Sequence, residues 1–125
     1  PEDHVFRWEL EDWRATKDTK ITLTIDRPVE GWNEKVGFPH ILVQDMDVDV
    51  NNTYAVLCGP PVMIKALTNS LVEKGFPKDK IYTTLEMRMT CSMGKCGRCN
   101  IGHQYVCIDG PVFSMTELAD MPNEY

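Results

Sequence analysis

The residues best suited to chemistry in this sequence are cysteines near its C-terminal end. Four of the five cysteines fall within seventeen positions, with the spacing C-x4-C-x2-C-x7-C: Cys91, Cys96, Cys99 and Cys107. Thiolates bind soft metals and iron–sulfur clusters. A disulfide framework fits poorly, because the cysteine count is odd and no secretion signal opens the chain. The pattern therefore predicts a metal or iron–sulfur site in a reducing compartment, which we expect to be the cytoplasm.

The cysteine spacing leaves two kinds of centre open. C-x4-C-x2-C followed by a further cysteine matches the plant-type [2Fe–2S] pattern, with a much shorter last gap. A zinc ion held by four cysteines would close a small loop-rich module equally well. Zinc usually has paired C-x2-C units, however, and only Cys96 and Cys99 form one here. Two glycines, which let backbone N–H groups approach cluster sulfurs, and two basic residues lie between the cysteines: Gly94, Gly97, Lys95 and Arg98.

A second segment of interest is Cys58-Gly59-Pro60-Pro61, which begins at the last residue of the apolar run 53–58. We expect that run to be a buried parallel strand and the prolines to begin a helix. Ligands in open parallel sheets bind beyond the carboxyl ends of the strands, next to helix N-termini. The sequence contains no Ser/His/Asp arrangement, carboxylate pair or phosphate loop, so we assign no catalytic residue.

The remaining elements follow from hydrophobic periodicity. Helices are predicted at 4–13, where Phe6, Leu10 and Trp13 form one apolar stripe, within 38–46, from the prolines to about residue 74, and at 114–120. Ser114 followed by Glu117 is a capping-box pattern for the last of these. Strands are predicted at 20–25, 53–58 and 81–85. Alternating helices and strands indicate an α/β fold with a parallel sheet.

Composition excludes several classes of function. The net charge is −6, and residues 1–50 carry 12 acidic and 6 basic side chains. This acidic balance argues against a nucleic-acid partner. No apolar run approaches the roughly 18–20 residues of a transmembrane helix. We therefore expect a globular protein without a transmembrane segment.

The two segments together resemble one protein family. Cys-Gly-Pro-Pro-Val-Met at 58–63, a helix, residues 81–86 and the four-cysteine pattern are similar to the C-terminal portion of iron–sulfur flavoprotein reductases of the ferredoxin–NADP⁺ reductase superfamily. Its members include electron-transfer subunits of dihydroorotate dehydrogenase, the corresponding subunit of anaerobic sulfite reductase and hydrogenase gamma subunits. Residues 83–113 resemble the hydrogenase and sulfite reductase group most, because the dihydroorotate dehydrogenase subunits have a longer gap before the fourth cysteine.

The resemblance implies electron transfer between NAD(P)H, FAD, a [2Fe–2S] cluster and a partner redox subunit of a hydrogenase or reductase complex. It implies that Cys58, Gly59 and Pro60 border the nicotinamide. It also implies that the cluster ligands are Cys91, Cys96, Cys99 and Cys107. The alternative is a zinc-stabilised structural docking module of a larger complex.

The expected organisation is a partial doubly wound parallel sheet followed by a loop-rich [2Fe–2S] module. Residues 1–85 would be the C-terminal half of a nucleotide-binding reductase domain, 86–113 the cluster module and 114–125 a tail with a short helix. The chain has neither the family's FAD-binding barrel nor a G-x-G-x-x-G/A turn. We therefore expect it to be part of a longer polypeptide that holds the FAD and NAD(P) sites, with little catalytic competence of its own.

Overall fold

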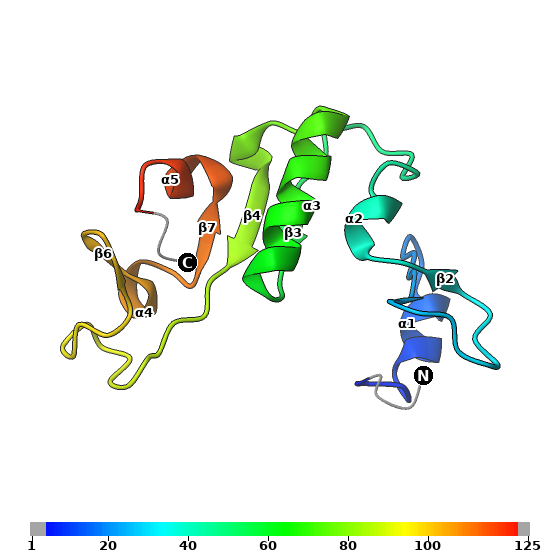
Figure 1. Ribbon diagram of the computed structural model, residues 1–125, viewed down its shortest axis with the longest axis horizontal. Coiled ribbons are helices and arrows are strands. Elements are labelled where there is room, and N and C mark those ends of the chain that lie inside the picture. The colour runs from blue at the N-terminus through cyan, green and yellow to red at the C-terminus, as the bar shows by residue number, and fades with distance from the viewer. Residues whose placement is uncertain (1–4, 123–125) are drawn as a thin grey trace. The chain divides into compact units, whose positions relative to one another are not determined.

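The computed structural model describes residues 5–122 and divides into two compact units, Pro1–Pro39 and His40–Tyr125. Figure 1 labels the elements of both units. None of the helices in residues 5–122 has the length and the apolar character that a membrane span requires. The structure contains helices together with parallel and mixed sheets, which confirms the predicted α/β class.

The first unit contains less regular structure than its sequence predicts. Helix α1 spans Leu10–Ala15, and strand β1, Thr24–Ile25, pairs in parallel with β2, Lys35–Val36. The predicted start of the helix is wrong, since Phe6 has a positive φ of 59° that a right-handed helix does not accept. Phe6 still contacts Trp13, with ring centroids 5.9 Å apart. Residues 1–4, where we expected the helix to begin, lie outside the described residues.

The sheet of the second unit has the order β3-β4-β7. Strand β3, Ala55–Leu57, runs parallel to β4, Ile81–Thr84, as predicted. Strand β7, Val112–Ser114, pairs antiparallel to β4 on its other side, with Thr83 opposite Phe113. The sheet is therefore mixed, and the expectation of a wholly parallel sheet needs this correction. The short helix α2, Pro39–Leu42, and the 3₁₀ helix η1, Lys78–Lys80, precede β3 and β4 respectively.

Helix α3, Pro61–Lys74, covers one face of this sheet (Figure 1). It begins with Pro61 in its first turn and ends at Gly75, which has a φ of 103°, so both predicted ends are confirmed. The buried side chains of Leu67 and Leu71 pack in one apolar core with Leu57 of β3 and Ile81 of β4. This core fixes the start of α3 beside the carboxyl ends of the strands.

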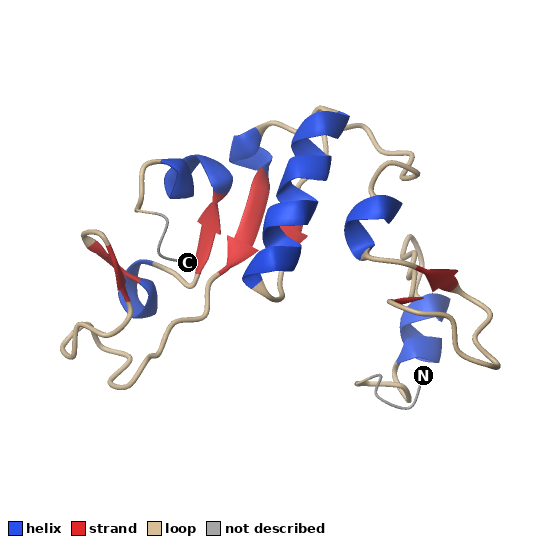
Figure 2. Cartoon of the chain, viewed as in Figure 1, coloured by secondary structure: helices blue, strands red, loops and turns tan. Residues whose placement is uncertain are grey.

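A second apolar core lies beneath the cysteine-rich segment. That segment contains a small hairpin, β5 at Asn100–Ile101 and β6 at Gln104–Tyr105, followed by helix α4 at Val106–Asp109. Figure 2 shows that the stretch between β4 and β5 is loop, as predicted. Seven buried residues form the core: Leu85, Cys99, Ile101, Val106, Phe113, Leu118 and Met121. Met115 packs against both this core and the core under α3.

Helix α5, Met115–Ala119, begins with the capping box that the sequence predicts. The backbone N–H of Glu117 donates to Ser114 Oγ at 3.2 Å, and the backbone N–H of Ser114 donates to Glu117 Oε2 at 2.7 Å. The backbone N–H and the hydroxyl of Ser114 both donate to Glu117 Oε2, which favours the charged form and holds the pKa of the Glu117 carboxyl below its ordinary value. The box fixes the direction in which Leu118 enters the second core.

Replacing the cap should lower the stability of this region. We expect Ser114→Ala to lower the free energy of unfolding by about 1 kcal/mol, because Ser114 is buried and the N–H of Glu117 loses its acceptor. Denaturant unfolding followed by circular dichroism measures the change. Thr116→Ala, on the exposed side of the same helix, is the matched control and should change stability by less than about 0.5 kcal/mol. Equal effects of the two substitutions would contradict the role of the cap.

Candidate functional site

The cysteine-bearing loop leaves the end of β4 and returns to the sheet at β7. The N–H of Leu85 donates to the carbonyl of Pro111 at 2.9 Å, which closes the loop at its base. The N–H of Val106 donates to the carbonyl of Cys99 at 3.0 Å, which ties the hairpin to the loop. From residue 86 to residue 99 the backbone makes successive bends and turns and forms no helix or strand. The loop is therefore held at its ends and shaped in between by local turns.

Cys91 and Cys96 form one pair of thiols in this loop. The backbone N–H groups of Lys95 and Cys96 each donate to Cys91 Sγ at 3.3 Å. Donation from the N–H groups of Met93, Cys96 and Lys95 lowers the pKa of the Cys91 thiol to about 6, and the Cys96 thiol contributes in the same direction. Hydrogen bonds to sulfur favour the thiolate, which is the form that binds metal.

Cys99 and Cys107 form the second pair. Cys99 is only 1% exposed within the second core, while Cys107 is partly buried and accepts the N–H of Gly94 at 3.3 Å. A hydrogen bond with the Cys99 thiol, followed by burial, raises the pKa of Cys107. The charge of Cys91 raises it further, so the two pairs interact electrostatically. The loop thus brings all four predicted cysteines into one region as two pairs.

The two centres that the sequence left open need different arrangements of their ligands. Within residues 5–122, no group of three or more His, Cys, Asp or Glu side chains is arranged to hold a metal ion. A structural zinc site needs four ligands around one ion, at about 2.0–2.3 Å. A [2Fe–2S] cluster has two irons and takes its four thiolates in pairs. The four thiols of this loop supply the donor set that both centres use.

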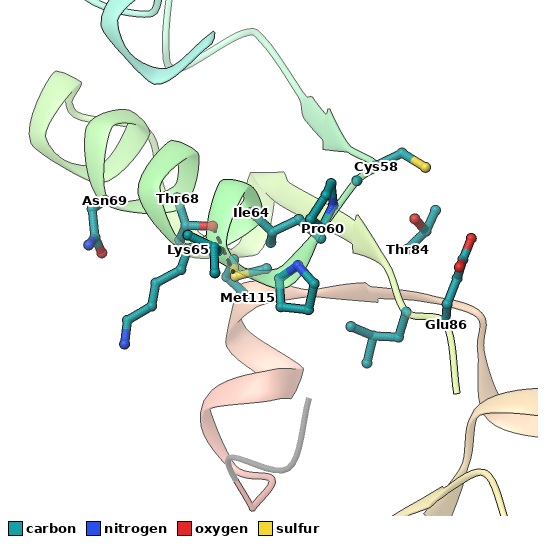
Figure 3. Close-up of a pocket in the computed structure, with 13 residues that line it drawn as sticks. Cys58, Pro60, Ile64, Lys65, Thr68, Asn69, Thr84, Glu86 and Met115 are labelled. Atoms are coloured by element: carbon teal, nitrogen blue, oxygen red, sulfur yellow. Dashed lines mark hydrogen bonds between the residues drawn. The ribbon is translucent and has the colours of Figure 1, made fainter. Parts of the chain in front are cut away.

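A cavity of about 970 Å³ lies beside the carboxyl ends of β3 and β4. Cys58, Gly59 and Pro60, the residues predicted to border the nicotinamide, all line it (Figure 3). Gly59 has a φ of 153°, and a Cβ there would lie 2.1 Å from Met63 Cε. Glycine therefore keeps this turn compact at the point where the chain leaves β3 for α3. The cavity can admit a flat ring next to backbone and to the positive end of α3.

Sequence reasoning missed several residues of the cavity wall. Lys65 and Thr68 come from α3, and their spacing from Pro61 by one and two helical turns was a usable signal. Glu86 follows β4, and the parallel pairing of β3 and β4 could have placed it near Cys58. Met115 comes from α5, where the Thr68 hydroxyl donates to its sulfur at 3.6 Å. No sequence signal pointed to Met115, because β7 brings it there (Figure 3).

Comparison with known sequence families matches both halves of this site. The oxidoreductase NAD-binding domain family matches residues 1–69, and the iron–sulfur cluster binding domain of dihydroorotate dehydrogenase B matches residues 86–119. The chain belongs to the NAD-binding oxidoreductases of the iron–sulfur flavoprotein reductase type.

Individual relatives agree with this family. Over 127 residues the chain is 35% identical to the gamma subunit of sulfhydrogenase 1 from Pyrococcus furiosus, an alignment covering 96% of this chain and 43% of the relative. It is 46% identical over 90 residues to the gamma subunit of sulfhydrogenase 2 from the same organism, covering 67% of this chain and 31% of the relative. It is 34% identical over 97 residues to the electron transfer subunit of dihydroorotate dehydrogenase B from a Geobacillus strain, covering 72% and 35%. The chain spans less than half the length of these curated relatives.

These findings confirm the predicted family, an NAD-binding oxidoreductase domain followed by an iron–sulfur cluster binding domain. They do not favour the zinc-stabilised docking module. The individual ligands and the nicotinamide contacts stay predictions from the sequence.

The buried member of the second thiol pair gives a direct test of the ligand set. We expect Cys99→Ser to abolish the cluster and to disorder roughly residues 86–110, because metal binding supplies folding energy to such a loop. Residues 55–84, which have their own core under α3, should stay folded. Iron and sulfide assays, visible absorption and hydrogen exchange measure these effects. The matched control is Cys58→Ser, which should keep the cluster, and unchanged cluster spectra in Cys99→Ser would show that the ligand set is wrong.

Proposed function

We propose that this chain is the electron-transfer portion of an NAD(P)H-, FAD- and [2Fe–2S]-dependent oxidoreductase subunit. It would pass electrons between nicotinamide, flavin and a partner redox subunit of hydrogenase or sulfite reductase type. When bound, the flavin divides the electron pair of a hydride and the cluster carries single electrons. The chain's own residues would hold the cluster and border the nicotinamide, while the flavin would be bound by the rest of the polypeptide.

The proposal depends most on the continuity between the cavity and the thiol pairs. Thr84, Leu85 and Glu86 line the cavity, and Cys91 follows five residues after Glu86. The bond from Leu85 to Pro111 holds this short connection at the base of the loop. A ring bound in the cavity and a cluster in the loop would therefore be joined by one short, anchored segment of chain.

The cavity suits the nicotinamide end of the proposed pathway. Cys58 is exposed at the end of β3, and Gly59 brings backbone to the cavity wall without a side chain. Ile64, Leu85 and Met115 supply apolar surface for a ring. Lys65 is an exposed cation on the same wall, suited to a negatively charged part of a dinucleotide.

The loop suits the cluster end. We assign Cys91 and Cys96 to one iron and Cys99 and Cys107 to the other, because the thiols already lie in these pairs. Backbone N–H groups directed at Cys91 and Cys107 offset the negative charge of the thiolates. Residues 86–113 would form this module and 114–125 its tail.

The same proposal extends to organisation and location. Residues 1–85 would be the second half of a doubly wound nucleotide-binding domain. The side chain of Val56 on β3 is 70% accessible to solvent. Further parts of such a domain would cover an apolar strand side chain of this type. Free thiols that bind iron require a reducing compartment, so we assign the protein to the cytoplasm.

Anaerobic purification with metal and sulfide assays tests the proposed function. We expect about two irons and two sulfides per chain, and a spin-half EPR signal after reduction with dithionite. In the FAD-containing protein, NADH or NADPH should produce the same signal. Zinc in place of iron, or a cluster that dithionite reduces but neither nicotinamide reduces, would contradict the proposal.

A substitution at the cavity separates the nicotinamide end from the cluster end. In the FAD-containing protein, Cys58→Ser should slow reduction by NADH or NADPH about tenfold, because it alters the surface against which the ring is oriented. Reduction by dithionite, which does not use the cavity, should keep its wild-type rate. Stopped-flow absorption measures both rates. An unchanged nicotinamide rate would remove Cys58 from the proposed contacts.

A further inference from the structure

Two apolar side chains are exposed beside the thiol pairs. Met93 and Ile108 are each 59% accessible to solvent. The backbone N–H of Met93 donates a hydrogen bond to the Cys91 thiol. Ile108 directly follows Cys107 in the sequence. A Cβ on Gly94 would lie 2.2 Å from Ile108 Cδ1, so the side chain of Ile108 rests against the glycine that follows Met93. The loop thus presents adjacent apolar surface to solvent beside its metal-binding sulfurs.

The charge of this loop differs from that of the whole chain. Residues 87–108 carry three basic side chains, Arg88, Lys95 and Arg98, and no acidic one, in a chain of net charge −6. All three are exposed, and in the described part of the chain no salt bridge is formed by Lys95 or Arg98. Lys95 lies directly beside the first thiol pair, since its backbone N–H donates to Cys91 Sγ.

The first pair of cysteines, Cys91 and Cys96, is more exposed to solvent than the second pair, Cys99 and Cys107. Cys96 is exposed and Cys91 partly buried, whereas Cys99 is fully buried. A cluster held by these thiols would therefore approach the surface at the Cys91 and Cys96 side. An electron leaving at that side would pass the basic and apolar side chains described above.

We propose that Met93, Lys95, Arg98 and Ile108 form an exit face that docks a one-electron redox protein with an acidic rim around its own centre. This inference deepens the proposed function and rests on it. One electron passes from the reduced cluster, which is oxidised, to the partner's centre, which is reduced, and no atom or proton crosses with it. The opposite flow uses the same contact.

Charge complementarity determines this choice of partner. The thiolates and sulfides leave a bound cluster negatively charged, which repels an acidic partner. Lys95 and Arg98 offset that repulsion at the surface and steer an acidic partner towards the apolar centre formed by Met93 and Ile108. An apolar centre inside a charged rim is the usual arrangement of a protein interface.

Two redox proteins of opposite charge serve as probes. The cluster-containing protein is reduced with a slight amount of dithionite and mixed in a stopped-flow instrument with oxidised rubredoxin, which is acidic, or cytochrome c, which is basic. We expect Lys95→Glu/Arg98→Glu to slow oxidation by rubredoxin at least about tenfold at low ionic strength and to accelerate oxidation by cytochrome c. High salt should reduce both differences.

A matched charge reversal controls for net charge. Lys20→Glu/Arg27→Glu makes the same change at exposed residues of the first unit and should leave the rubredoxin rate within about twofold of wild type. Met93→Gln should slow rubredoxin at high salt as well, because it removes apolar contact rather than charge. Equal rates in the exit-face and control variants, with iron, sulfide and EPR signal intact in both, would overturn the exit face alone. Absence of the cluster from the wild-type protein would overturn the proposed function and the exit face together.

A second copy of the chain is the competing occupant, because residues 1–50 are strongly acidic. Sedimentation velocity over a range of protein concentrations separates the cases. Self-association that the Lys95→Glu/Arg98→Glu variant abolishes would assign the exit face to a second copy and overturn the docking of a different redox protein. A concentration-independent sedimentation coefficient in both proteins supports the proposal.

Discussion

The pairing of β7 with β4 is the interaction on which the rest of the site depends. Thr83 lies opposite Phe113, and the bond from Leu85 to Pro111 extends the contact beyond the strands. The cysteine-bearing loop therefore starts and finishes at the same end of two neighbouring strands. The same pairing positions α5, whose Met115 packs against both apolar cores and lines the cavity. One short antiparallel contact thus relates the thiol pairs to the carboxyl ends of β3 and β4.

Features with a local physical cause could be predicted from the sequence. Helix α3 has proline at its start and a left-handed glycine at its end, and each signal depends only on neighbouring backbone. The capping box of α5 is equally local, because Ser114 and Glu117 satisfy each other's backbone groups. The cysteine spacing predicted that four thiols would gather, and hydrogen bonds within a short loop are sufficient to bring Cys91 and Cys96 together.

Features that depend on distant partners could not be predicted in the same way. Strand β7 has three residues, and its pairing with β4 spans the whole cysteine-bearing segment, so no periodicity reveals it. Met115 was missed in the cavity for the same reason. In the first unit the alternating residues 20–25 predicted a full strand, but only Thr24 and Ile25 find partners, because strand structure requires hydrogen bonds from a neighbour. The left-handed backbone conformation of Phe6 could not be predicted either, because the apolar stripe of Phe6, Leu10 and Trp13 gives no information about φ at a single residue.

The closed loop between Leu85 and Pro111 also has a consequence for assembly. Bringing the ends of a long segment together costs chain entropy, which grows with the length of the segment. A cluster held by the four predicted ligands, Cys91, Cys96, Cys99 and Cys107, would divide this segment into shorter closed pieces. Insertion of the cluster and docking of β7 would each lower the entropic cost of the other, so the two steps would be thermodynamically coupled. Release of the cluster would then loosen Met115 and with it one wall of the cavity, and a chain without its metal would hold a ring less firmly.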